Sequence, residues 1–440
     1  MSTPNAVLDS SSDRDHKDPS LGIEHNVASP EEQTKPVSRF TRWYRSPLFN
    51  VIIVGLISFT QPGIWNALNN TGAGGQQEPY LVNGANSLTF GIMVFGCSLF
   101  GILANKIGLK WVLIIGTLGY APYSAALYTN NRYGVEWTVE TGIWLGLREL
   151  GQLIGSSIQL SLNVKSGKRG RVGYTTYLVL IALQCLGLPL AFLISPPEKV
   201  IRSDGSRLPH TKTKKSVKDQ AKKWAALLRR KQFYLLIPIL VGFNWNSTYL
   251  GIYLVNYFSV RSRTLASLTS GIAATAANIF WGWFFDLKAI SRPRLARITW
   301  VFLAVFMTAL FGWQFAMELE YRGANPPVTL DWDLPGFGRG FAVQVLFMNE
   351  SHYMFVYWIL GTFFDDVETL TLAVGLVRSF ESLGSCLAFG VGAAKVAPLT
   401  NLIVAFVMFC ISLPSTSFAV FLVPERPSEN ALGKDDDSSE

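Results

Sequence analysis

Polar and charged side chains interrupt several long apolar stretches of this chain. Segment 143–163 carries Arg148, Gln152, Ser156 and Gln159 at positions i, i+4, i+8 and i+11, which places them on one face of a helix. A polar stripe of this kind suits the wall of a cavity. It suits hydrogen bonds between packed helices equally well, so both interpretations stay open.

Two pairs of ionisable residues also stand in apolar segments. Arg378 and Glu381 are spaced i, i+3, so they can pair on one helix face. They are either a structural ion pair or an anchor for an anionic substrate (Arg378) beside a titratable gate (Glu381). Glu350 and His352 could relay protons, although the run Met-Asn-Glu-Ser-His also fits the end of a helix.

Asparagines occur in two further segments and are candidate functional residues there. Asn244 and Asn246 break an apolar segment near its middle, which is typical of a helix that faces a polar cavity. Asn66 and Asn69 end the first apolar stretch, and glycines follow them without the Gly-Lys-Ser/Thr of a phosphate loop. Asn69-Asn70-Thr71 is a glycosylation acceptor if it faces a lumen.

Enzyme chemistry has no basis in the sequence. It contains no His/Cys cluster, nucleophile elbow or kinase signature, so we expect no enzyme, no cofactor and no metal site. The four cysteines all fall in apolar runs and are expected to be small buried hydrophobes.

The composition places these residues in a membrane. The chain has 440 residues, 49% of them hydrophobic and 15% charged, against about 25% charged in ordinary soluble domains. Charge is clustered, and between the clusters lie apolar stretches of about 20 residues, the length that crosses a bilayer. Backbone groups must be satisfied internally there, so the sequence predicts an all-α integral membrane protein.

We predict five spans before a polar linker and six after it, about eleven in all. The domain plan is a tail (1–46), an N-terminal bundle (47–195), a linker (196–232), a C-terminal bundle (233–424) and a second tail (425–440). The predicted spans are 48–68, 86–104, 111–128, 143–163, 173–195, 233–257, 266–285, 298–317, 338–362, 368–394 and 399–423.

The linker explains the net charge of +8. Segment 196–232 holds twelve basic and three acidic residues, and such a loop beside spans marks the cytoplasmic side. The tails are expected on the same side, with the acidic segment Glu318–Leu334 opposite. No nucleic-acid module accompanies the basic residues. Within the linker, 214–232 is either an amphipathic helix lying on anionic lipid or a solvated charged segment.

Between the second and third spans, the segment Gly101-Ile-Leu-Ala-Asn105-Lys106-Ile-Gly108-Leu-Lys110 resembles the loop signature of the major facilitators. The signature has an acid where this chain has Asn105, which cannot form a charged pair. A rough counterpart at Gly282–Lys288, containing Asp286, suggests an internal repeat. The resemblance implies two helix bundles that enclose a midplane site.

A narrower resemblance begins at the first span. Pro62–Gly75, Tyr257–Leu265 and the stretch from Tyr357 through Arg378 to Ser382 resemble the Unc-ninety-three-like family, most closely its fungal members. The resemblance implies a transporter-like membrane protein, and some animal members of the family act instead as partners of channels or receptors. This chain has Arg378 and Glu381 where the family usually has Lys and Gln.

Two functions follow from these observations. The leading hypothesis is a multi-pass transporter, in the plasma membrane or an endomembrane, that moves a small solute or ion by alternating access. The alternative is a regulator or trafficking partner of another membrane protein, which Asn105 favours. In both cases membrane lipid is a partner and nucleic acid is not.

The count of spans carries one more prediction. The N-terminal tail and the linker both look cytoplasmic, so an even number of crossings should separate them, but five are found. Tyr128–Trp137 resembles the family's loop after the third span, and Gly142–Gly155 resembles its fifth span. Only Thr138–Thr141 lies between them. The sequence therefore predicts that the fourth span is missing, either because the gene model or a splice variant lost that helix or because this member has eleven spans.

Overall fold

The computed structural model describes residues 38–72, 79–107, 110–111, 114, 151–170, 172–196, 199–200, 217–242, 244–287, 289–325, 327–347, 351–363 and 367–425. In this part of the chain the regular structure is helical apart from one isolated parallel bridge between Phe258 and Leu330. Residues 39–440 form one unit. We call residues 39–200 the first half and residues 231–425 the second half.

The first half begins with the short helix α1 (Arg39–Tyr44) and the first span. Ser46 caps α2 by accepting a hydrogen bond from the Phe49 amide, and Pro47 occupies the first helical position. Pro62 removes a backbone donor inside the span, where the helix widens into a π turn. The elements are α2 (Pro47–Ser58), η2 (Phe59–Gly63), α3 (Ile64–Asn69), α4 (Pro79–Ile107), the helical residues 151–163, α8 (Tyr174–Cys185) and α9 (Gly187–Phe192).

The second half follows the linker helix α10 (Val217–Leu228). One of its spans is divided near Asn244, and residues 348–350 of another lie outside the described residues. The elements are α11 (Lys231–Tyr234), α12 (Ile237–Gly242), α13 (Trp245–Tyr257), α14 (Val260–Phe285), α15 (Arg292–Arg322), α16 (Phe337–Phe347), α17 (Ser351–Phe363), α18 (Val367–Ala393) and α19 (Pro398–Phe421).

Six helical stretches of the described chain are long and apolar enough to cross a membrane. They are Pro47–Ala67, Thr175–Phe192, Lys231–Tyr257, Arg292–Arg322, Leu372–Ala393 and Pro398–Phe421. The stretches in α8–α9 and α19 are mostly exposed, whereas that in α18 is mostly buried. In a membrane protein the exposed apolar faces meet lipid, so α18 is central and α19 peripheral.

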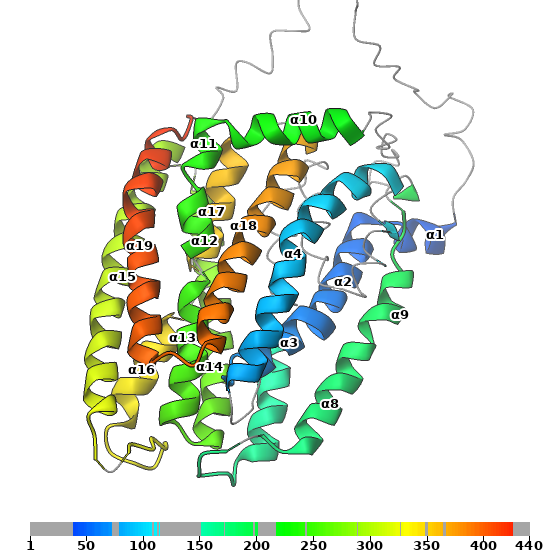
Figure 1. The fold of residues 1–440 in the computed structure, drawn as a ribbon. Coiled ribbons are helices and arrows are strands. Elements are labelled where there is room, and N and C mark those ends of the chain that lie inside the picture. The colour runs from blue at the N-terminus through cyan, green and yellow to red at the C-terminus, as the bar shows by residue number, and fades with distance from the viewer. Residues whose placement is uncertain are drawn as a thin grey trace, which may run out of the picture. The chain divides into compact units, whose positions relative to one another are not determined.

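The two halves meet along α4 and α18, which lie side by side in Figure 1. Small residues permit this close approach. A Cβ added at Gly91 would lie 3.4 Å from the Cys386 Sγ, and one at Gly375 would lie 3.4 Å from the Cys97 carbonyl oxygen. The Ser87 hydroxyl also donates to the Cys386 carbonyl at 2.8 Å.

The linker helix α10 crosses one end of the bundle (Figure 1). Leu227 is buried, and Trp224 and Leu228 pack against the core of the second half, while Lys222 and Arg230 are exposed. The segment therefore forms an amphipathic helix, and its apolar face is covered by protein.

Two expectations are wrong. Cys185 and Cys410 are exposed, and Cys97 and Cys386 are only half-buried. They lie on apolar helices whose outer faces need no burial inside protein, because lipid is as apolar as a core. The predicted acidic loop is also too long, because α15 continues to Arg322 and buries Glu318.

The gap at Thr138–Thr141 lies outside the described residues, as do most of span 111–128, Tyr128–Trp137 and the two tails except for residues 38–46 and Glu425.

Candidate functional site

The start of α14 carries a polar cluster of the second half, beside the place where α14 contacts the first half. Ser259 has extended backbone and caps α14 by accepting a hydrogen bond from the Ser262 amide at 3.3 Å. The Ser259 amide donates to the Leu330 carbonyl at 3.0 Å. This fixes the loop between α15 and α16 beside the first turn of α14, so that Arg261 and Ser262 face its aspartates.

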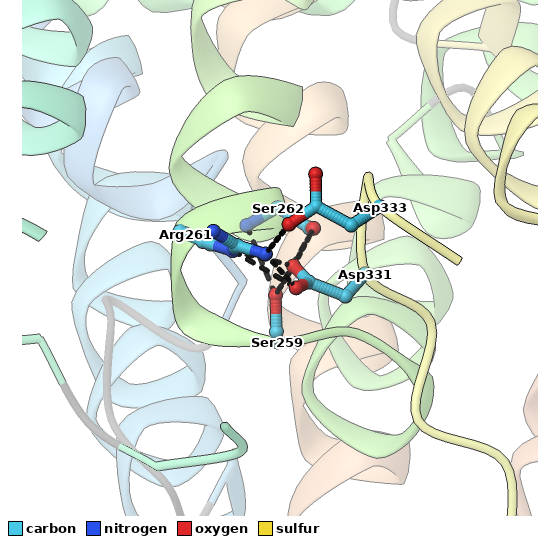
Figure 2. Close-up of polar contacts among 5 residues, drawn as sticks. All are labelled: Ser259, Arg261, Ser262, Asp331 and Asp333. Carbon is cyan, nitrogen blue, oxygen red and sulfur yellow. Dashed lines mark hydrogen bonds and ion pairs between the residues drawn. The ribbon is translucent and has the colours of Figure 1, made fainter. Parts of the chain in front are cut away.

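Asp331 is the centre of this cluster (Figure 2). The Arg261 Nε lies 2.9 Å from each Asp331 carboxylate oxygen, and its Nη2 contacts both Asp331 and Asp333. The hydroxyls of Ser262 (2.9 Å) and Ser259 (2.5 Å) donate to the same carboxylate. The Arg261 guanidinium, helped by the two hydroxyls, lowers the pKa of Asp331 to about 2. The carboxylate is therefore charged at any physiological pH.

The same turn of α14 binds the loop that follows residues 151–163. The Val260 amide donates to the Lys168 carbonyl at 3.0 Å, and the Arg261 amide donates to the Ser166 carbonyl at 3.1 Å. In return, Arg169 donates to the Val328 carbonyl. We call these contacts between α14 and the first half, together with the Asp331 cluster, the clamp. It lies at the end of the bundle opposite α10 (Figure 1).

Arg263 extends the clamp inward. Its side chain is 1% exposed and donates to the carbonyls of Thr71 (2.8 Å), Gly72 (2.9 Å) and Gly170 (2.9 Å). Gly72 has φ +84°, and a Cβ there would lie 2.8 Å from the Gly251 carbonyl oxygen. Only glycine therefore fits where the end of α3 meets the second half.

The polar stripe of 151–163 continues the contact one turn deeper. Gln152 donates to the Ser267 carbonyl at 3.3 Å, and the hydroxyls of Ser156 and Ser267 are 2.7 Å apart. Gln159 accepts a hydrogen bond from Thr71 at 2.6 Å. These side chains join helices, which is the second of the two interpretations of the stripe. Arg148 lies outside the described residues.

A second polar group is centred on Glu381 of α18. The Arg378 Nη1 lies 2.8 Å from the Glu381 Oε2, so the predicted ion pair is present. Tyr357 of α17 donates to the same carboxylate at 3.1 and 3.2 Å. The Arg378 guanidinium also lies 5.7 Å from the centre of the Tyr357 ring. We call Arg378, Glu381 and Tyr357 the central triad.

Neighbouring groups connect the central triad to the rest of the core. Tyr353 stacks on Tyr357 with ring centres 6.3 Å apart and donates to the Asn244 side chain at 3.0 Å. Asn244 stands where the span divides between α12 and α13, so this predicted polar break contacts α17. The central triad lies within a turn or two of Gly375, where α4 of the first half makes its close approach.

The other predicted site residues stand apart from these two groups. Asn246 and His352 are buried, and the Asn246 amide atoms have no hydrogen-bond partner in the described structure. Glu350, the other member of the predicted Glu/His relay, lies outside the described residues. Asn66 and Asn69 are half-buried in α3. Thr71 of the sequon is fully buried, and glycosylation of Asn69 stays a prediction.

The loop-signature residues fall near the end of α4. Gly101, Asn105 and Lys106 lie in its last turns, their side chains are outside the described part, and so is Gly108. Lys110 donates to the Phe192 carbonyl at 3.4 Å. Asp286, from the counterpart motif, is exposed and ends α14.

Sequence reasoning missed Glu318 as a site candidate. Its side chain is buried and accepts hydrogen bonds from Tyr249 (2.7 Å) and Tyr257 (3.2 Å) of α13. The available signal was the spacing of Tyr249, Tyr253 and Tyr257 on one helix face. No group of three or more metal-binding side chains occurs among the residues described.

Comparisons with known proteins support the same architecture. No protein-family model matches the chain. It is 29% identical to a notoamide biosynthesis cluster protein of Aspergillus versicolor, covering 90% of this chain and 92% of that one. It is 27% identical to UNC93-like protein 1 of Arabidopsis thaliana (93% and 96% covered) and 25% identical to an UNC93-like protein of Schizosaccharomyces pombe (87% and 86%).

Two solved transporters have the same fold. The xylose transporter XylE of E. coli matches with a TM-score of 0.52 at 13% identity, covering 88% of this chain and 98% of that one. The human organic anion transporter MFSD10 matches with a TM-score of 0.50 at 12% identity, covering 89% and 100%. The predicted family resemblance and the all-α, major-facilitator-like membrane fold are confirmed.

Proposed function

We propose that this UNC93-like membrane protein of the major-facilitator fold moves a small solute or ion by alternating access. The clamp is the observation that carries the proposal. It joins the two halves at one end of the bundle, mainly through hydrogen bonds from α14 to backbone carbonyls. A transporter of this fold needs such a closure on one side of a midplane site.

The energetics of the clamp suit a gate. Hydrogen bonds between membrane helices are worth roughly 0.6–2 kcal/mol each, so a handful of them can close one side and still be replaced by contacts elsewhere. The Arg261–Asp331 pair lies wholly within the second half and would stay intact when the halves separate. It would then keep α14 rigid while its partners in the first half change.

The central triad is the proposed substrate-contact group. It stands on the most buried span, close to the α4–α18 contact between the halves, and intramembrane charges are functional candidates by default. In this proposal Arg378 and Glu381 exchange part of their mutual contact for contact with a polar substrate.

A second function is favoured by two specific observations. Asn105 replaces an acid in the loop signature, and only Thr138–Thr141 stands where the family has a helix. A chain that lacks a wall of its first bundle fits a regulator or trafficking partner better than a transporter.

Flux through the purified protein in proteoliposomes tests the proposal. The substrate panel should include sugars, organic anions and, because the Aspergillus relative is named for a biosynthesis cluster, small organic metabolites. We expect flux, and we expect Glu381→Ala to abolish it when flux is measured per folded molecule in the liposomes, because this substitution also lowers stability. Glu320→Ala is the matched control, because Glu320 pairs with Arg339 on the exposed surface and its loss should leave flux unchanged.

The gate is tested with cysteines at Lys168 and Val260, whose backbones are hydrogen-bonded across the halves. Oxidation should stop flux, and reduction should restore it, while either single cysteine should have no effect. Recovery of a membrane-protein partner without flux of any panel substrate would favour the regulator instead.

A further inference from the structure

The short helix α1 presents bare aromatic and basic side chains. Phe40 is 71% exposed and Trp43 is 58% exposed. Arg39 and Arg42 are exposed beside them, and no acidic residue occurs between Ser38 and Asn50. Exposing large aromatic rings to water is unfavourable. We therefore expect this surface to contact a partner that accommodates both rings and cations.

Hydrogen bonds fix α1 at the end of the span formed by α8 and α9. The Tyr44 hydroxyl donates to the Leu193 carbonyl at 2.8 Å, and the Ser195 amide donates to the Asn50 side chain at 2.9 Å. Trp43 and Tyr44 both pack against Phe49, with ring centres 4.7 and 5.1 Å apart. The helix therefore keeps a set position where two spans end.

Lys110 adds to the same surface, and Trp111 follows it in the chain. The Lys110 Nζ lies 3.4 Å from the carbonyl of Phe192, next to the residue that holds Tyr44. Trp111 is 58% exposed. Residues far apart in the sequence thus bring rings and cations to one place. We call Arg39, Phe40, Arg42, Trp43, Lys110 and Trp111 the interfacial belt.

The outer surface next to the interfacial belt is apolar. Leu48 and Ile52 are exposed on α2, and Phe192 and Leu193 are exposed at the end of α9. These residues belong to spans whose outer faces meet lipid. The exposed rings of α1 continue this lipid-facing surface, so the partner that contacts the interfacial belt is the bilayer. Aromatic residues concentrate at the headgroup level of membranes for this reason.

The linker helix α10 makes an informative contrast. Its Trp224 and Leu227 pack into the core of the second half, so α10 presents cations such as Lys222 and Arg229 without exposed rings. Of these two helices, α10 therefore presents charge without exposed rings, whereas α1 presents charge and exposed rings together.

We propose that the interfacial belt is a binding site for anionic phospholipid headgroups. Phe40, Trp43 and Trp111 lie at the level of the headgroups, and Arg39, Arg42 and Lys110 bind their phosphates. Arg pairs well with phosphate through two parallel N–H···O bonds. Anionic lipids are concentrated in the cytoplasmic leaflet, where the basic linker predicts that this end of the bundle lies.

Native mass spectrometry of the full-length chain in detergent tests the site with added phosphatidylserine and phosphatidylcholine. The wild type should retain phosphatidylserine in preference. The variant R39Q/R42Q/K110Q should bind it at least about tenfold more weakly, because one cation near an anionic surface contributes about fivefold. The matched control K222Q/R229Q/R230Q removes three cations from α10 and the turn that follows it, and it should change binding by less than about twofold. F40A/W43A should also weaken binding.

Three outcomes would overturn the proposal. The first is equal retention of the two lipids by the wild type, and the second is an equal loss in the α10 control. The third is displacement of phosphatidylserine by inorganic phosphate or by an acidic peptide, which would assign the cations to a free anion or to a protein. The variant R39K/R42K/K110R keeps the charge and should keep the preference, which separates charge from misfolding.

Discussion

Glu381 shares its carboxylate between a guanidinium and a phenol. Its side chain is 4% exposed, and that of Arg378 is 20% exposed. An ion pair at this depth is weak evidence for stability by itself, because desolvation offsets attraction. Removing one member of the pair is destabilising, since the charge that remains is buried and has lost its partner.

We therefore predict that Arg378→Ala and Glu381→Ala each lower the free energy of unfolding by about 3–5 kcal/mol. The double variant should recover part of the loss, because no uncompensated charge remains. Thermal unfolding in detergent measures all three, with Tyr357→Phe as a control that removes only one hydroxyl. Additive losses in the double variant would mean that the two charges do not depend on each other.

The clamp should be insensitive to physiological pH. The pKa of Asp331 falls to about 2, below an ordinary value of about 3.9. The stabilisation by this carboxylate is therefore fully present above about pH 4 and is lost only as the pH falls toward 2. We expect the difference in melting temperature between wild type and Asp331→Asn to stay constant from about pH 8 to 4.5. A difference that changes in favour of the wild type as the pH falls between about 7 and 5 would show a raised pKa and would contradict this prediction.

Among the elements, the first two turns of α14 make most of the described hydrogen bonds between the halves. Ser259 begins the helix, Arg261 and Ser262 hold the α15–α16 loop, and Arg263 and Ser267 reach the first half. Arg263 can make its contact with the first half only if backbone carbonyls face it. The turn at Gly72 orients the carbonyls of Thr71 and Gly72 toward Arg263.

We predict that Gly72→Ala disrupts this contact. The substitution introduces both an unfavourable positive φ and a clash with the Gly251 carbonyl oxygen. Gly336→Ala is the matched control, since Gly336 has φ +83° but open space around it. The control should cost about 1–2 kcal/mol, and Gly72→Ala clearly more. Equal melting temperatures of the two variants would contradict the close approach.

For the whole molecule, the direction of the chain across the membrane is the first prediction. Positive charge in the linker should keep α10 on the cytoplasmic side, and the clamp should lie on the far side. In a cysteine-free background, a cysteine at Ser216 should react only from the cytoplasm and one at Leu334, which is 49% exposed, only from outside. The reverse pattern would refute the assignment.

The missing fourth span is the second prediction at this scale. The alignment with the Aspergillus relative is 434 residues long, yet it takes in 90% of a 440-residue chain. The relative therefore carries residues without a counterpart here. We expect the transcript between the codons of Trp137 and Gly142 to contain additional coding sequence. An uninterrupted transcript, together with a stable and transport-competent product, would show that this helix is dispensable.

Hydrophobic length and charge placement determined much of this protein from the sequence. The predicted spans that fall on described residues all lie on helices, because a bilayer demands apolar segments of fixed length. The helices α4, α14 and α15 run up to seven residues beyond the predicted bounds. The Arg378–Glu381 pair was also visible, since i, i+3 spacing on a helix brings side chains together without help from other elements.

Only the tertiary structure decided which helices those side chains join. Gln152 and Ser156 meet Ser267 because residues 151–163 pack against α14, and that partner leaves no mark on either segment by itself. Glu318 was taken for part of a loop because an acid near the end of an apolar run looks solvated. It is buried because the hydroxyls of Tyr249 and Tyr257, from a different helix, replace the water that it would lose.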